Sequence, residues 1–112
     1  MSSALAAETS REKSMQTNIS GKHFVVTPAI EEYIRKKTDR IAKHFDRIQA
    51  IAVVCEREAH EFHVEIRIDV EHHDDFIANA KQEDLYACVD LAVDRATRQI
   101  TDHKERTRDR KH

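Results

Sequence analysis

Two arginines near the C-terminus have a spacing suited to binding phosphate. Arg95 and Arg98 are three residues apart, so on a helix they lie one turn apart on the same flank. They stand in the run 78–104, which predicts a short strand followed by a long amphipathic helix. Guanidinium groups in such a row can contact successive phosphates, because their planar donors match phosphate oxygens. This segment therefore indicates binding of a polyanion.

The charges of the chain are unevenly distributed, although the formal net charge is only −2. Residues 35–47 contain six basic and two acidic residues, and residues 95–112 contain seven and three. Residues 56–75, by contrast, contain eight acidic and two basic residues. Because a local field decides where a polyanion binds, the two basic segments predict a nucleic-acid partner.

The first basic segment is predicted to lie on a helix. Thr27 followed by Pro28 is a strong helix start, with threonine as the cap and proline at the first helical position. Apolar residues and one threonine then recur every three or four positions, at Ile30, Ile34, Thr38, Ile41 and Phe45. Basic residues fall on the adjoining arc, at Lys36, Lys37, Arg40, Lys43 and His44.

Four segments are predicted to be strands. Residues 62–70 alternate without a break between apolar and polar side chains, which predicts one buried and one exposed face. Residues 48–56 are largely apolar and rich in β-branched side chains, as in a central strand. Weaker signals place a first strand at 15–20 and a fourth at 76–81. Acidic residues mark the exposed face, at Glu65, Asp69 and Glu71.

The last helix is expected to begin near Gln82 or Glu83. Its buried side would contain Leu85, Val89, Ala92, Val93, Ala96 and Ile100. The order βαβββα predicts an α+β two-layer domain, with a four-stranded, mostly antiparallel sheet and both helices on one face. We therefore expect two parallel rows of cations on the helix side and an acidic face on the sheet side.

A length of 112 residues accommodates one domain. Residues 1–14 are small, polar and aperiodic, so we expect a disordered N-terminal extension, either natural or an added tag. The folded domain is expected at residues 15–106, and residues 107–112 are expected to form a basic C-terminal tail.

Two cysteines lie in apolar segments, one in a predicted strand and one in a predicted helix. Cys55 and Cys88 are therefore expected to be reduced core residues of a cytoplasmic protein. The longest apolar run, 50–55, is far shorter than the roughly 20 residues of a membrane span, so no membrane partner is expected.

Four histidines fall close together around the predicted strand 62–70. They are His60, His63, His72 and His73. Zinc sites usually place their ligands at helical or knuckle spacing, whereas these histidines fall in turns and on an exposed strand face. We therefore expect surface histidines, no metal and no cofactor.

No residue pattern predicts an enzyme. Glu83 and Asp84 beside Tyr86 form the most suggestive acidic group, and capping of the following helix explains them. The chain has one glycine, so it has no glycine-rich phosphate loop. Tyr33 and Tyr86 are predicted at the edge of the core with their hydroxyls in water, and stacking on a base is the alternative.

Two blocks of the sequence resemble the ribosome hibernation promoting factor family, which includes ribosome-associated inhibitor A. The first is Ile19-x-Gly21-Lys22 followed by Thr27-Pro28-Ala29-Ile30-x-x-Tyr33-Ile34-x-x-Lys37. The second is Ala80-x-x-Glu83-Asp84-Leu85-Tyr86-Ala87-x-Val89-Asp90 followed by Arg95-x-x-Arg98-Gln99-Ile100. The match covers residue 15 to about residue 106.

The resemblance implies a βαβββα fold like that of double-stranded RNA-binding domains. It also implies binding to the small ribosomal subunit and its rRNA in the mRNA and tRNA channel, which would inhibit translation in stationary phase or stress. The residues that it places against rRNA are Lys22, Lys37, Arg40, Lys81, Arg95, Arg98, Lys104 and Arg106.

The basic ending RTRDRKH resembles the short promoting-factor type, which pairs ribosomes with help from a separate ribosome modulation factor. The free protein is expected to be a monomer. The chain departs from the family at Asp102, where a lysine is usual, and at three positions where larger aliphatics are usual, namely Thr38, Ala92 and Ala96. Two alternatives stay open: a general double-stranded RNA-binding module, and a protein-interaction regulator that uses the acidic sheet face.

Overall fold

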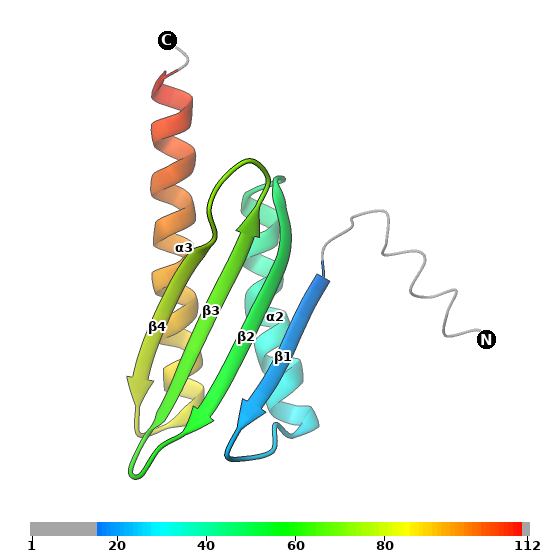
Figure 1. Cartoon of the computed structure of the whole chain (residues 1–112), viewed down its shortest axis with the longest axis vertical. Coiled ribbons are helices and arrows are strands. Elements are labelled where there is room, and N and C mark those ends of the chain that lie inside the picture. Colours follow the sequence, from blue (N-terminus) through cyan, green and yellow to red (C-terminus); the bar gives the residue numbers. More distant parts are fainter. Residues whose placement is uncertain (1–15, 111–112) are drawn as a thin grey trace, which may run out of the picture.

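The computed structural model describes residues 16–110, which form four strands and two helices in two layers (Figure 1). In chain order these are β1 (Gln16–Lys22), α2 (Pro28–His44), β2 (Ile48–Arg57), β3 (Phe62–Val70), β4 (Phe76–Gln82) and α3 (Leu85–Arg110). The predicted βαβββα order is confirmed. The extension expected at 1–14 lies outside the described residues, as does the end of the expected tail, 111–112.

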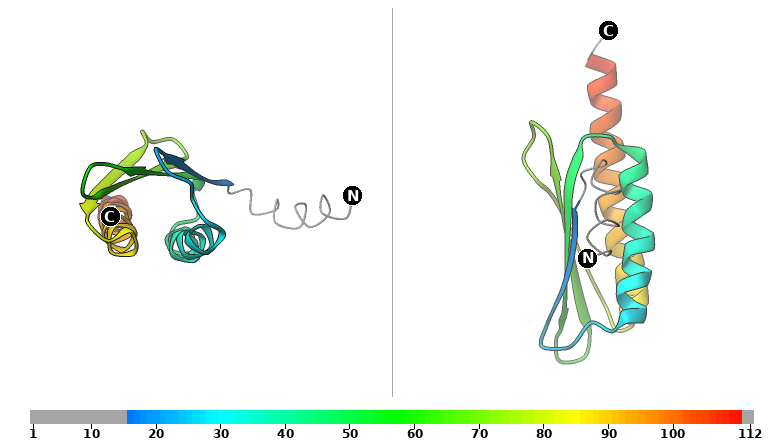
Figure 2. Two further views of the ribbon diagram at one scale, coloured as in Figure 1. Left: turned by 90° about the horizontal axis from the view of Figure 1, so that it is seen from below. Right: turned by 90° about the vertical axis from the view of Figure 1, so that its right-hand side faces the viewer.

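The four strands form one sheet in the order β1-β2-β3-β4. β1 runs parallel to β2, and the other neighbouring pairs are antiparallel. The parallel pair needs a crossover connection, which α2 provides. Both helices cover the same side of the sheet (Figure 2). No helix of residues 16–110 covers the other side, which is called the open sheet face below.

Along each strand, successive side chains point alternately to the helix-covered face and to the open sheet face. In β3 the side chains of Val64, Ile66 and Ile68 are buried beneath the helices. Between them, Glu65 and Arg67 project from the open sheet face. The alternation predicted for residues 62–70 is thus confirmed, and it fixes which side chains the helices cover.

The helices press small side chains against the sheet. Thr38 of α2 and Ala92 and Ala96 of α3 are at most 1% exposed, so the three positions where the family usually has larger aliphatics lie in the core. The buried hydroxyl of Thr38 donates to the carbonyl of Ile34, with 3.0 Å between the oxygens. That bond removes most of the penalty for burying a hydroxyl group.

The predicted cap of α2 is confirmed. Thr27 Oγ1 accepts a hydrogen bond from the amide of Ile30 at 3.2 Å, and Pro28 occupies the start of the helix.

The start of α3 differs from the prediction by a few residues. β4 continues to Gln82, and α3 begins at Leu85 rather than near Gln82 or Glu83. Asp84 ends the intervening turn, because its Oδ2 accepts from the amide of Ala87 at 2.9 Å and so caps the helix. Within residues 16–110, neither helix is long and apolar enough to span a lipid bilayer.

The two cysteines are buried free thiols, as predicted. Burial raises the pKa of Cys55 to about 11 and also raises the pKa of Cys88. The thiol of Cys88 donates to the carbonyl of Ala80 at 3.2 Å. Both groups are protonated at neutral pH, so neither is an activated nucleophile.

Two histidines meet among aromatic rings at the end of the sheet near the β3–β4 turn. The ring of His73 stacks on Phe76 with 4.5 Å between centroids, and His103 of α3 packs edge-on against His73 at the same distance. Phe45 closes the cluster, 5.7 Å from His103. His73 is exposed, as expected of a surface histidine, and its ring also takes part in this aromatic cluster.

The pKa of His103 is lowered from its ordinary value of 6.5, mainly because the side chain is desolvated. Positive charge on His73, Arg106 and Arg47 lowers the pKa further. The folded protein therefore binds a proton at His103 less readily than the unfolded chain does.

This difference predicts a loss of stability in mild acid. The free energy of unfolding should fall as the pH drops through about 6.5, because protons then bind preferentially to the unfolded chain. Urea denaturation at pH 7.5 and at pH 5.5 measures this change. The variant His103→Gln should show a smaller drop, whereas the control His72→Gln, whose side chain is 82% exposed, should behave like the wild type. If the free energy of unfolding of His103→Gln fell as much as that of the wild type, the loss of stability in acid could not be assigned to His103.

Candidate nucleic-acid interface

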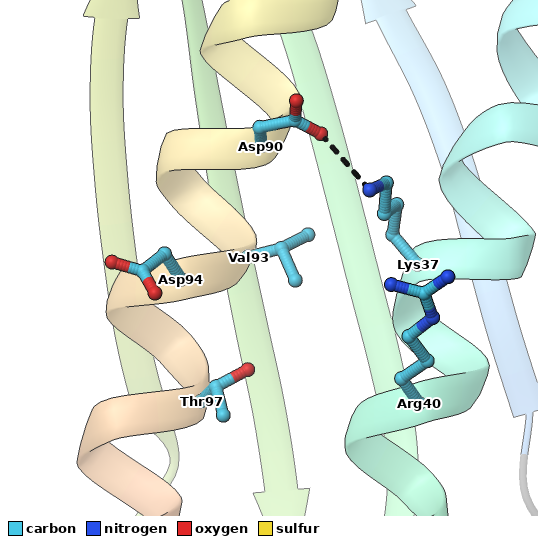
Figure 3. Close-up of a pocket in the computed structure, with 6 residues that line it drawn as sticks. All are labelled: Lys37, Arg40, Asp90, Val93, Asp94 and Thr97. Carbon is cyan, nitrogen blue, oxygen red and sulfur yellow. Dashed lines mark ion pairs between the residues drawn. The ribbon is translucent and has the colours of Figure 1, made fainter.

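A groove between the two helices brings basic and acidic side chains together (Figure 3). Lys37 and Arg40, one turn apart on α2, face α3 across it. On α3, Asp90 points towards Lys37, whereas Asp94, one turn further along, borders the groove with its carboxylate directed away from α2. The groove has a volume of about 240 Å³, and Val93 and Thr97 complete its lining. The cations predicted on α2 therefore lie within reach of carboxylates.

Asp90 links both helices. Its Oδ1 accepts a hydrogen bond from the hydroxyl of Tyr33 at 2.6 Å and lies 3.4 Å from Nζ of Lys37. The same ammonium group lies 5.2 Å from the centre of the Tyr33 ring. The hydroxyl of Tyr33 is thus bound to a carboxylate, whereas we expected it to be in water.

The two tyrosines pack against each other at the end of this groove. The rings of Tyr33 and Tyr86 meet edge to face, with 4.8 Å between centroids. The pKa of Tyr33 is raised above its ordinary value of 10.0, first because the hydroxyl donates to Asp90, then because of desolvation and the negative charge of Asp90. Tyr33 is therefore held as a neutral donor.

The other flank of α3 faces the outer edge of β4. Nη1 of Arg95 donates to the carbonyl of Asn79 at 2.7 Å, and Nε2 of Gln99 donates to the carbonyl of Ile77 at 3.0 Å. Arg98 lies on the same flank and forms an ion pair with Asp94, with 3.3 Å between nitrogen and oxygen. Arg95 therefore has a structural contact that its spacing did not predict.

Two of the predicted rRNA-binding lysines lie on the open sheet face. Lys81 follows the buried Ala80 in β4, so its exposed side chain projects away from the helices. Lys22 lies at the end of β1 opposite Glu56, which projects from the same face. The expectation that cations gather on the helix side and acids on the sheet side is therefore wrong for these two lysines.

The remaining two predicted residues lie towards the end of α3. Lys104 and Arg106 are exposed on the part of this helix that extends beyond the sheet (Figure 1). The helix continues to Arg110, but the side chains of residues 107–110 lie outside the described part of the chain. The eight cations are thus spread over the groove, the β4 edge, the open sheet face and the end of α3, and not arranged as two parallel rows on one side.

Ion pairs with carboxylates, at 3.3–3.4 Å, hold some of these cations. They are Lys37 with Asp90, Lys81 with Glu58 and Arg98 with Asp94. Exposed ion pairs of this kind contribute about 0–1 kcal/mol each, because water and salt screen them. A phosphate group can therefore replace the carboxylate at modest cost, although the acids reduce the local positive field.

The comparison with known proteins identifies the family. Residues 17–108 match the family model described as Sigma 54 modulation protein / S30EA ribosomal protein. The chain belongs to this family. This chain is 39% identical over 92 residues to the ribosome hibernation promoting factor of Azotobacter vinelandii. That match covers 82% of this chain and 85% of the relative.

Solved structures support the same fold for this S30EA chain. A ribosomal subunit interface protein from Coxiella burnetii superposes with a TM-score of 0.76 at 24% identity, covering 81% of this chain and 99% of the other. The N-terminal domain of Thermus thermophilus Protein Y superposes with a TM-score of 0.68 at 28% identity, covering 74% and 91%. The predicted family and fold are therefore both confirmed.

Asp90 is the groove residue whose role the sequence did not predict. It stands in the second block of the family resemblance, but an aspartate on an exposed helix face has no evident partner in the sequence. Its partners Tyr33 and Lys37 are more than 50 residues away on the other helix. Its place on the flank of α3 that faces α2 becomes visible only once the two helices are packed together.

Removing the charge of Asp90 should make Tyr33 easier to ionise. In Asp90→Asn the pKa of Tyr33 is expected to fall towards 10.0, because the phenolate no longer faces a carboxylate. Ultraviolet titration measures both tyrosines of the chain, and a Tyr33→Phe variant identifies which transition belongs to Tyr33. Asp94→Asn provides the matched control and should leave the Tyr33 transition in place. Identical titrations for wild type and Asp90→Asn would contradict the assignment.

Proposed function

We propose that this S30EA-family chain is a ribosome hibernation factor. It binds the small ribosomal subunit through rRNA, blocks the sites of mRNA and tRNA and inhibits translation in stationary phase or stress. The match of residues 17–108 to the family is the observation that most directly supports this proposal. The name of the Azotobacter vinelandii relative points to the same role.

The proposed mechanism is occlusion by binding in the cytoplasm, without catalysis. Arg40 of α2 and Arg98 of α3 are both exposed, so they can reach phosphates of a folded RNA surface. Lys37 joins them once a phosphate replaces Asp90 as its partner. Lys22, Lys81, Arg95, Lys104 and Arg106 complete the proposed rRNA contacts.

The proposal extends to ribosome pairing. The basic ending of the chain resembles that of the short promoting factors, so the bound protein would promote ribosome dimers together with a separate modulation factor. Sucrose-gradient profiles of ribosomes with and without the protein distinguish dimers from silenced single ribosomes. Competition with free duplex RNA distinguishes both from a general double-stranded RNA-binding module, which free duplex would displace readily.

Binding to ribosomes should weaken steeply with salt, because cations that contact phosphates release counterions. For about five phosphate contacts, the logarithm of affinity should fall against the logarithm of salt concentration with a slope of about −3.5 to −4.5. Co-sedimentation with ribosomes across a salt series measures this slope. A slope near zero would exclude the electrostatic mechanism.

Charge reversal tests which surface binds. Arg40→Glu and Arg98→Glu should each weaken co-sedimentation about tenfold or more, since each removes one phosphate contact and adds repulsion. Arg35→Glu makes the same change on the same helix as Arg40, at a side chain that is not among the proposed rRNA contacts. This control should bind nearly as well as the wild type. Equal losses in all three variants would show that only the overall charge matters.

A further inference from the structure

We propose that the open sheet face contains a binding site for a divalent transition-metal ion, best fitted by zinc, formed by Glu56, Glu58 and His63. One ligand atom of each side chain lies within 4.8 Å of the other two. All three side chains are partly buried, with 23–33% of their surface exposed. The site lies on the opposite side of the sheet from the helix groove and does not depend on the proposed ribosome binding.

Paired strands hold the ligands in place. Glu56 of β2 and His63 of β3 are direct partners in the antiparallel register. Glu58 follows two residues after Glu56 in the hairpin, where its amide donates to the carbonyl of Glu61 at 2.8 Å. Both carboxylates therefore lie near the imidazole, with one ligand atom of each side chain within 4.8 Å of the others. A ligand set supported by a sheet is better ordered than one on free loops.

The orientation of His63 is the strongest argument for a metal ion. Its Nε2 lies 2.8 Å from Oδ1 of Asn79 on β4, and its Nδ1 faces Glu56 Oε1 at 3.9 Å. With the proton on Nε2 donated to Asn79, Nδ1 presents its lone pair to the carboxylates. Metal-binding histidines are typically held in this way, because a hydrogen bond from the second nitrogen selects the tautomer and orients the ring.

The distances also fit an ion better than a direct contact. A separation of 3.9 Å is too long for a hydrogen bond between Nδ1 and Glu56. Zinc bonds of about 2.0–2.2 Å in tetrahedral geometry place neighbouring ligand atoms roughly 3.3–3.6 Å apart. A small shift of the side chains would therefore seat the ion. Imidazole suits zinc, whereas magnesium prefers oxygen ligands alone.

Two further side chains border the site. Nε2 of His23, in the turn after β1, lies 3.9 Å from the other oxygen of Glu56, so His23 is placed to supply a fourth ligand. Nζ of Lys81 lies 3.4 Å from Glu58 Oε1 and competes with a cation for that carboxylate. Binding of zinc would therefore replace the ion pair between Lys81 and Glu58.

Calorimetric titration of the full chain with zinc sulfate tests the proposal. The wild type should bind a single zinc ion, and His63→Gln should abolish this binding. Asn79→Ala should weaken it about 10–100-fold through the lost support of the imidazole. Lys81→Met should tighten it, because the competing ammonium group is gone. His60→Gln, a matched control at an exposed histidine of the same hairpin, should bind zinc like the wild type.

Circular dichroism establishes that each variant is folded, and nuclear magnetic resonance of the histidine nitrogens shows which atom of His63 responds to zinc. A response at Nδ1 supports the site. Zinc binding that persists unchanged in His63→Gln, or no binding by the wild type, would overturn the proposal. None of these measurements involves ribosomes. A failure to bind zinc would therefore leave the proposed function untouched, and a failure to bind ribosomes would leave the zinc site untouched.

Discussion

The structure depends on burying only one face of the sheet. Two helices cover that face, and alternate residues of each strand supply the apolar side chains beneath them, such as Val53 in β2 and Ile66 in β3. The intervening side chains must then project into solvent on the other side. This constraint decides where each polar group is displayed. The same pattern that builds the core thus places Lys22 and Lys81 on a different surface from the cations of the helices.

Close packing of the helices on the sheet has a second consequence. Small side chains at Thr38, Ala92 and Ala96 share the fully buried helix positions with larger ones such as Ile34 and Ile100. The two helices therefore lie side by side on the sheet, with a polar groove between their outer surfaces. Asp90 crosses this groove to hold Tyr33 and Lys37, so the relative position of the helices is supported by polar contacts as well as by the core.

Much of this arrangement could be predicted from the sequence, because it follows from local patterns. The alternation of residues 62–70, the cap at Thr27 and the helical spacing on α2 each depend on neighbours within a few residues. The start of α3 was placed too early, since the competition between the end of β4 and the cap at Asp84 is not visible in the apolar pattern.

The features that the sequence did not predict involve partners far apart in the chain. Asp90 meets Tyr33 across 57 residues, and the hydrogen bond of His63 to Asn79 requires the register of two strands. The family resemblance indicated the basic residues, but it did not show on which face of the sheet each one lies. Successive residues of a strand point to opposite faces. Because Ala80 is buried beneath the helices, the next residue, Lys81, projects from the open sheet face.

The contacts of Arg95 and Gln99 with β4 also bear on how the protein behaves at high concentration. An outer strand exposes backbone carbonyls that can pair with a strand of another molecule and so begin aggregation. Here two side chains of α3 occupy the carbonyls of Asn79 and Ile77. The helix thus shields this border of the sheet against intermolecular strand addition.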